Sequence, residues 1–141
     1  MLEGLVLLFS VQAIMLTLEK QRVGELKCQK DAYCTSIRPT VLSCEAEDEK
    51  YAVILSDTVI FPTGGGQPND TGFIDNVKVL DCQRRGLDCV HIVAEPVEVG
   101  ASVTVTLDWE RRFDHMQQHS GQHLLSDVAE FMFGWNTSSW F

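Results

Sequence analysis

Residues 102–125 read SVTVTLDWERRFDHMQQHSGQHLL, and the spacing of their apolar side chains changes partway along the stretch. Up to Trp109 the apolar residues alternate with polar ones, a period of two that predicts a strand with one buried and one polar face. From Arg111 they recur at intervals of three, four and eight, which predicts an amphipathic helix over residues 112–133 that Gly134 ends. The strand side chains expected to point inward are Val103, Val105 and Leu107. The apolar stripe of the helix should comprise Phe113, Met116, Leu124, Val128 and Phe131.

Further β-rich runs lie upstream, separated by turn residues or by an acidic loop. They are residues 40–44, 51–55, 58–61, 73–82 and 89–94. Short strands at this spacing predict a mostly β domain, a small antiparallel barrel or sandwich over residues 28–110. A single helix after such a domain is unbalanced, so we expect residues 111–141 to be the incomplete start of a second domain. Residues 1–27 are predicted to form a helical extension that ends near Gly24.

The composition is typical of a globular protein with a core, since 45% of the 141 residues are hydrophobic and 22% are charged. The formal net charge of −9 argues against a protein that holds nucleic acid by bulk electrostatics, because phosphate binding usually needs a basic surface. Local contact with RNA through a small cluster such as Arg84–Arg85 or Arg111–Arg112 stays open.

The sequence argues against a membrane protein and against a secreted one, although residues 5–16 are apolar enough to pass for the core of a signal peptide. No stretch approaches the ~20 apolar residues of a membrane helix, and the apolar residues 5–16 are preceded by Glu3 and by no Lys or Arg. The five cysteines are odd in number and include no CxxC pair, which fits neither a disulfide framework nor a zinc ribbon. We therefore expect reduced thiols and a cytoplasmic protein.

Three histidines lie four residues apart on the predicted helix, at positions 115, 119 and 123. Imidazoles at i and i+4 lie on one face about a turn apart, so two of them can bind one metal ion, and neutral imidazole suits Zn²⁺. All three cannot bind it, because the first and the third are about 12 Å apart along the axis. The alternative is that these are ordinary surface or core histidines. The lack of Glu between them argues against the HExxH motif of metalloproteases.

A glycine-rich segment, FPTGGGQPNDTG at residues 61–72, lies between predicted strands. Consecutive glycines tolerate positive φ angles and let a ligand approach the main chain closely, although an ordinary loop can have the same composition. The segment lacks the GxxxxGK[ST] pattern, so a nucleoside-triphosphate P-loop is not supported.

Taken together, FPTGGGQPNDTG and the later LDWERRFDHMQQHSGQHLL resemble the editing domain of alanyl-tRNA synthetases and the free-standing AlaX-type trans-editing family. The resemblance covers roughly residues 28–139. It implies a small N-terminal β-barrel, followed by an HxxxH helix that opens an α+β editing domain. It also implies a zinc-dependent activity, the hydrolysis in trans of the ester that joins a wrong amino acid, chiefly serine, to tRNA for alanine.

The resemblance places the family's zinc-binding HxxxH pair on His119 and His123 and leaves His115 outside it. In the family a downstream CxxxH pair completes the tetrahedral site, whereas no Cys or His follows His123 here. The alternative is therefore a catalytically inactive, truncated fragment that acts at most as a binding or regulatory module.

The resemblance also implies a substrate pocket beside the zinc pair, with no catalytic residue specified. Its candidate residues are Gly64, Gly65, Gly66, Gln67, Ser120 and Gln122. The last two, next to the ligands, are candidates to contact the serine hydroxyl, and many relatives have Thr where Gln122 stands. The implied cofactor is Zn²⁺ and the implied partner is the aminoacyl end of mischarged tRNA, with no DNA, no membrane and the oligomeric state left open.

Overall fold

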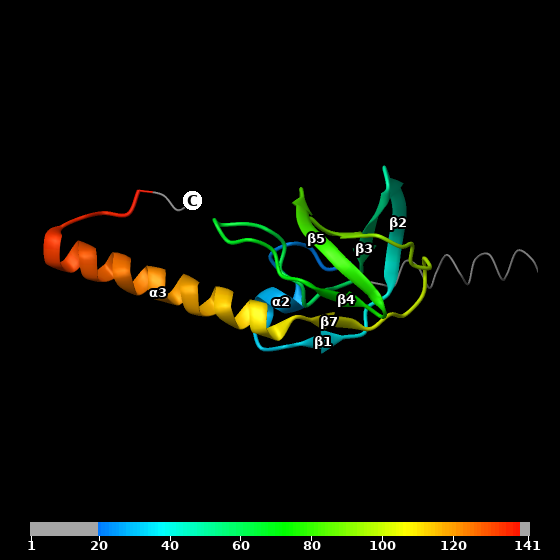
Figure 1. Cartoon of the computed structure of the whole chain (residues 1–141), viewed down its shortest axis with the longest axis horizontal. Coiled ribbons are helices and arrows are strands. Elements are labelled where there is room, and N and C mark those ends of the chain that lie inside the picture. Colours follow the sequence, from blue (N-terminus) through cyan, green and yellow to red (C-terminus); the bar gives the residue numbers. More distant parts are fainter. Residues whose placement is uncertain (1–19, 139–141) are drawn as a thin grey trace, which may run out of the picture.

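The computed structural model describes residues 20–138, which form one seven-stranded antiparallel sheet and a long helix that projects from it (Figure 1). The strands are β1 Ser36–Ile37, β2 Val41–Glu47, β3 Lys50–Leu55, β4 Gly72–Ile74, β5 Val77–Arg85, β6 Asp88–Val93 and β7 Val105–Leu107. They lie side by side in the order β1-β7-β4-β5-β6-β3-β2. The helices are α2 Lys27–Lys30 and α3 Trp109–Phe133. Neither is long and apolar enough to cross a membrane.

The two ends of the strand order, β1 and β2, follow each other along the chain, and the segment between them reaches the residues that precede β7. Thr40 forms an isolated bridge with Ser102, and the amide of Val41 donates to the carbonyl of Ala101 at 2.9 Å. The prediction of a mostly β, antiparallel region is confirmed. The sheet is not closed by a continuous ladder, so a barrel is not confirmed.

Three predicted strands differ from the structure, and the one predicted up to Trp109 is shortened to β7, so that Val103 precedes it. Residues 58–61 form no strand, and their backbone bonds to side chains and loops instead of pairing in the sheet: the amide of Ile60 donates to the hydroxyl of Thr58 at 3.0 Å, and the amide of Phe61 donates to Asp70 Oδ2 at 2.8 Å. Residues 73–82 are divided between β4 and β5 by a tight turn in which Asp75 has a positive φ of 50°.

The predicted N-terminal helix over residues 1–27 lies mostly outside the described residues. Within the described part, residues 23–25 form a turn, the other residues before Lys27 have no regular secondary structure, and the first helical residue is Lys27. Strand β1, which sequence periodicity did not predict, has two residues and pairs with β7.

The core lies on one face of the sheet, and alternate strand residues build it because side chains of a strand point to opposite faces in turn. Val103, Val105 and Leu107 are 4%, 0% and 6% exposed, which confirms that they point inward. Strands β4 and β7 approach so closely that a Cβ atom on Gly72 would lie 2.1 Å from the carbonyl oxygen of Thr106. Only glycine fits at this position.

Helix α3 confirms the helix predicted from the change of period. Asp108 caps its first turn by accepting from the amide of Arg111 at 3.3 Å, and Gly134 ends it with a left-handed φ of 69°. Beyond its first turns the helix extends away from the sheet (Figure 1). The far part of the apolar stripe is therefore uncovered by residues 20–138, with Leu124 66% and Phe131 90% exposed.

Candidate functional site

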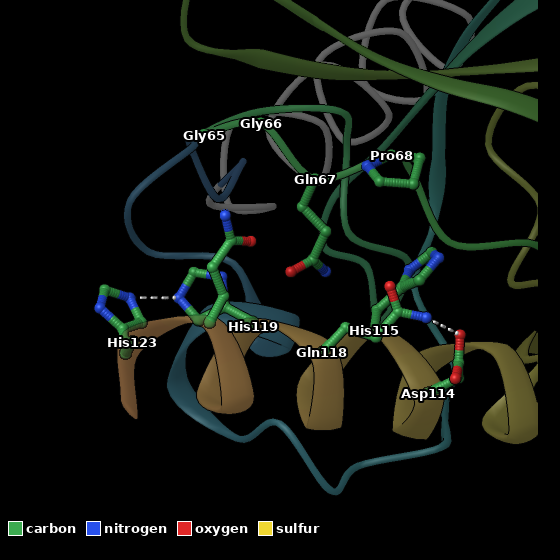
Figure 2. A pocket seen from close by; sticks show the side chains of 10 residues that line it. Gly65, Gly66, Gln67, Pro68, Asp114, His115, Gln118, His119 and His123 are labelled. Atoms are coloured by element: carbon green, nitrogen blue, oxygen red, sulfur yellow. Dashed lines mark hydrogen bonds between the residues drawn. The ribbon is translucent and has the colours of Figure 1, made fainter. Parts of the chain in front are cut away.

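A cavity of about 180 Å³ lies between the glycine-rich turn and one face of α3 (Figure 2). The lining residues are Gly65, Gly66, Gln67 and Pro68 from the turn and Asp114, His115, Gln118, His119, Gln122 and His123 from the helix. The fold thus brings together the two segments that the sequence singled out separately.

His119 and His123 lie next to each other on the helix, one turn apart (Figure 2). Their Nε2 atoms are 3.0 Å apart and their ring centroids 4.6 Å apart. Two imidazole nitrogens that bind one tetrahedral Zn²⁺ ion are about 3.3 Å apart, given a Zn–N length of ~2.0 Å. The rings therefore fit half of a tetrahedral zinc site. Among residues 20–138, no further Cys, His, Asp or Glu joins these rings to make a group of three potential ligands.

The glycine run forms a tight two-residue turn. The amide of Gly64 donates to the carbonyl of Gln67 at 3.2 Å, and the amide of Gln67 donates back at 3.1 Å. Between them Gly65 and Gly66 have φ values of 60° and 79°. Positive φ at both central positions is the geometry of a type I′ turn, which glycine adopts without a steric penalty. The turn directs the side chain of Gln67 toward α3 (Figure 2).

The two helix residues considered for contact with a substrate hydroxyl lie in different depressions. Gln122 lines the cavity that His119 and His123 share. Ser120 lines an adjacent depression of about 300 Å³, which contains only His119 of the pair. Two positions along a helix correspond to a rotation of about 200°, so these side chains cannot face the same ligand. Gln122 is the one placed beside both imidazoles.

A buried ion pair next to the cavity attaches α3 to the loops beside the sheet. The side chains of Arg112 and Asp70 are 3% and 0% exposed, and Arg112 Nε lies 2.9 Å from Asp70 Oδ2. The guanidinium also donates to the carbonyls of Ala32 at 2.9 Å and Val59 at 2.8 Å. The first turns of α3 are therefore held by charge-assisted hydrogen bonds to three separate segments of the chain.

His115 is buried against this ion pair and also lines the cavity. Its Nδ1 atom lies 3.9 Å from Asp70 Oδ1, and neither of these atoms has a hydrogen-bond partner among the described residues. Sequence reasoning missed the connection, because Asp70 and Arg112 are 42 positions apart. The only signals in the sequence for this contact were Asp70, near the end of the glycine-rich segment, and the i, i+3 spacing of Arg112 and His115.

The basic clusters considered for RNA contact are largely engaged within the protein. Arg112 is 2% exposed and cannot reach a phosphate. Arg111 donates from Nε to the carbonyl of Asn69 at 3.0 Å. Arg85 pairs with Glu47 at 2.8 Å on the surface.

A second group of potential metal ligands lies in the core between β5 and β6, and sequence analysis did not single it out. Cys82, Cys89 and His91 are buried, and their ligand atoms all lie within 4.8 Å of one another. No sequence motif marks them, because it is strand pairing that places Cys82 opposite His91. Burial lowers the pKa of His91 to about 4, and the hydrogen bond with Cys89, together with burial, raises the pKa of Cys82. All five cysteines are free thiols, as expected.

No family model matches the chain. Several known proteins are nevertheless similar to it in sequence. The alanyl-tRNA editing protein Aarsd1-A of Xenopus laevis is 47% identical over an alignment 125 positions long, which covers 80% of this chain and 30% of the relative. The putative alanyl-tRNA editing protein alaX of Saccharomyces cerevisiae is 38% identical over an alignment 138 positions long, which covers 84% of this chain and 30% of the relative. The alanyl-tRNA editing protein AlaX-M of Pyrococcus horikoshii is 40% identical over 108 residues, 74% of this chain and 48% of the relative.

The chain therefore spans 30% of the length of the frog and yeast relatives and 48% of the archaeal one. The matched residues nevertheless cover most of the chain, and the matched proteins from an animal, a fungus and an archaeon have the same editing name. Over the region that it shares with them, this chain is similar in sequence to alanyl-tRNA editing proteins.

Proposed function

We propose that the chain takes part in aminoacyl-tRNA editing in the cytoplasm, the zinc-dependent hydrolysis of seryl-tRNA for alanine in trans. The observation that carries the proposal is the placement of His119 and His123 with Gln67 around one cavity. The relatives named alanyl-tRNA editing proteins support it. His119 and His123 would hold Zn²⁺ through Nε2, and the ion would supply Lewis-acid polarisation of the ester carbonyl.

The other side chains of the cavity would position the substrate. Gln67, held by the type I′ turn, and Gln122 each have an amide that both donates and accepts hydrogen bonds, so each can bond a serine hydroxyl. A site built to hydrogen-bond a hydroxyl rejects the analogue that lacks it by a factor of ~10⁴ or more. Contacts of this kind would separate serine from alanine.

The proposed contact is with the aminoacyl end of the tRNA and not with its phosphate backbone. The net charge of −9 opposes bulk attraction to phosphate, and Arg112 is buried under Asp70. The aminoacyl group needs a cavity with polar side chains, which is what the turn and the helix face provide.

A binding or regulatory module without catalysis is the second candidate, and one observation favours it. The two imidazoles fill half of a tetrahedral site, and no third ligand joins them within the described part of the chain. Catalytic zinc sites usually have three protein ligands. We therefore expect the 141-residue chain alone to leave the ester intact.

Two proteins separate these functions: the 141-residue chain, and a hybrid of the Xenopus relative in which the matched region is replaced by the corresponding region of this chain. The measurement is the release of labelled serine from tRNA for alanine mischarged with serine, with and without a chelator. Editing predicts chelator-sensitive release by the hybrid, which His119→Gln and His123→Gln each abolish.

The unaltered Xenopus relative, assayed in parallel, is the reference for cleavage. A folded hybrid that leaves the ester intact, while the relative cleaves it, contradicts the editing proposal and supports the binding module. Release that is insensitive to the chelator contradicts the dependence on zinc.

A further inference from the structure

Antiparallel pairing of β5 with β6 brings two thiols and an imidazole together in the core. Cys82 pairs directly with His91, and Cys89 lies two residues before His91 on the same strand, so the three positions share one face of the hairpin. The Sγ atoms of Cys82 and Cys89 are 3.2 Å apart, and the three ligand atoms all lie within 4.8 Å of one another. Donors around one tetrahedral Zn²⁺ ion are about 3.3–3.8 Å apart, given Zn–N of ~2.0 Å and Zn–S of ~2.3 Å. Small side-chain rotations would bring the three donors to these separations.

The hydrogen bonds of His91 hold its ring in the form that a metal ligand needs. Nδ1 lies 3.3 Å from the carbonyl oxygen of Val53, and because a carbonyl only accepts, Nδ1 carries the proton. Nε2 then has the lone pair, which accepts from the hydroxyl of Thr58 at 2.9 Å. Histidines that bind metals almost always donate their other N–H to a carbonyl, a carboxylate or water.

The surroundings of the two sulfurs supply a further donor and set the charge that they can hold. The carbonyl oxygen of Ile60 lies 3.9 Å from Cys82 Sγ and 4.0 Å from Cys89 Sγ, in reach of a fourth position. Cys82, Cys89 and His91 are 0%, 6% and 1% exposed. A divalent cation bound by two thiolates is neutral overall, so it avoids the large cost of burying a net charge.

We infer that Cys82, Cys89 and His91 form a structural site for a thiophilic d¹⁰ cation, and that Zn²⁺ is the ion that suits this donor set. Binding forms two metal–sulfur bonds and one metal–nitrogen bond, and the two thiol protons leave to solvent. The hydroxyl of Thr58 turns away from His91 and keeps the hydrogen bond that it accepts from the amide of Ile60. The site is independent of the His119–His123 pair and of the proposed editing function.

Burial determines how the ion reaches this site. A folded chain offers no open path to side chains this deeply buried, so the ion binds as the chain folds, and its binding free energy adds to the free energy of folding. Refolding is therefore the step at which the site has to be tested.

The test is refolding of the reduced 141-residue chain from urea in the presence of Co²⁺ or Zn²⁺. The substitutions His119→Gln and His123→Gln are present throughout, so that the helix pair contributes no signal. Thiolate ligation of Co²⁺ gives a near-ultraviolet sulfur-to-cobalt charge-transfer band, which imidazole and carboxylate ligands do not give. We expect equimolar Co²⁺ with this band, no band when the chain refolds with Zn²⁺ in place of Co²⁺, and a higher urea midpoint after refolding with Zn²⁺ than with a chelator.

Three single substitutions test which cysteines give rise to the charge-transfer band. Cys82→Val and Cys89→Ala should each remove it, whereas Cys44→Ala, a cysteine change on β2 outside the cluster, should keep it. Circular dichroism establishes whether each variant folds. If the cysteine variants do not fold, the presence or absence of the band in the parent chain still tests the inference. A folded parent chain that shows no charge-transfer band after refolding with Co²⁺ overturns the inference, and so does a band that survives both Cys82→Val and Cys89→Ala.

Discussion

Asp70 accepts its hydrogen bonds through a single oxygen, and Arg112 supplies two of the three. Asp70 Oδ2 accepts from Arg112 Nε at 2.9 Å, from Arg112 Nη2, and from the amide of Phe61 at 2.8 Å. The other oxygen, Oδ1, faces His115 Nδ1 at 3.9 Å. Asp70 lies three residues after Gln67 in the glycine-rich segment, and Arg112 lies in the first turns of α3, so this pair joins the segment that contains Gln67 to the helix that contains His119.

Breaking this pair should destabilise the fold far more than breaking a surface pair. Arg112→Met leaves the Asp70 carboxylate buried without its partner, which costs about 3–5 kcal/mol of unfolding free energy. Arg85→Met, which breaks the exposed pair with Glu47, should cost much less because water screens that pair. Urea unfolding followed by circular dichroism measures both losses, and equal losses would contradict the role assigned to the buried pair.

Two glycine substitutions should shift stability in opposite directions. Gly72→Ala places a Cβ 2.1 Å from the carbonyl oxygen of Thr106 and forces β4 from β7, at a cost of about 1–3 kcal/mol or more. Gly121→Ala meets no atom within 4 Å and replaces glycine inside α3, which should favour the helix by about 1 kcal/mol. Thermal unfolding should show a lower midpoint for Gly72→Ala. The far-ultraviolet circular dichroism spectrum should show greater helicity for Gly121→Ala. A midpoint that rises in Gly72→Ala would contradict the close approach of β4 to β7, and helicity that falls in Gly121→Ala would contradict the open space beside Gly121.

His91 should make the stability of the metal-free chain depend on pH. Burial lowers its pKa from 6.5 to about 4, so between these values the unfolded chain binds a proton that the folded chain does not. Its contribution to stability is therefore complete above about pH 6.5 and is lost as the pH falls toward about 4, on the order of 3 kcal/mol in all.

The urea midpoint measured with a chelator from about pH 7.5 to about pH 4.5 checks this dependence. His91→Gln should flatten that part of the curve, and the NMR ring signals of His91 in the parent chain should stay unchanged down to about pH 5. Ring signals that move near pH 6.5 would show that the imidazole is accessible to protons in the folded chain.

Zinc added to the folded chain should bind weakly, and at His119 and His123 together. Two imidazoles provide half of a tetrahedral site, so we expect their NMR ring signals to shift on addition of Zn²⁺ and to recover after dialysis. His119→Gln should abolish the shift at His123, whereas His115→Gln should preserve it, because His115 Nδ1 faces Asp70. Loss of zinc binding in His115→Gln would make that residue a third ligand.

Several features of this chain follow from consecutive residues alone. The alternation through Val103, Val105 and Leu107 predicted a strand with its apolar face inward, and the switch of period after Trp109 predicted α3 with Gly134 as its end. The four-residue spacing of His119 and His123 predicted two rings on one helix face, as observed. The physical reason is that backbone periodicity acts over one or two turns of chain, so a short stretch contains all the information needed.

Contacts between distant segments were decided by the tertiary structure. The spacing of Asp70 and Arg112, 42 positions apart, follows no local period, and their pairing depends on how α3 packs beside the glycine segment. The pairing of Cys82 with His91 depends on hairpin register, in which a slip of one residue would turn every side chain of a strand to the other face. Residues 58–61 have the composition of a strand, yet they enter the core as a loop whose backbone bonds to side chains from elsewhere, among them the Asp70 carboxylate and the Arg112 guanidinium. Local spacing sets which elements form, and the competition among distant partners for burial and hydrogen bonds sets which side chains meet.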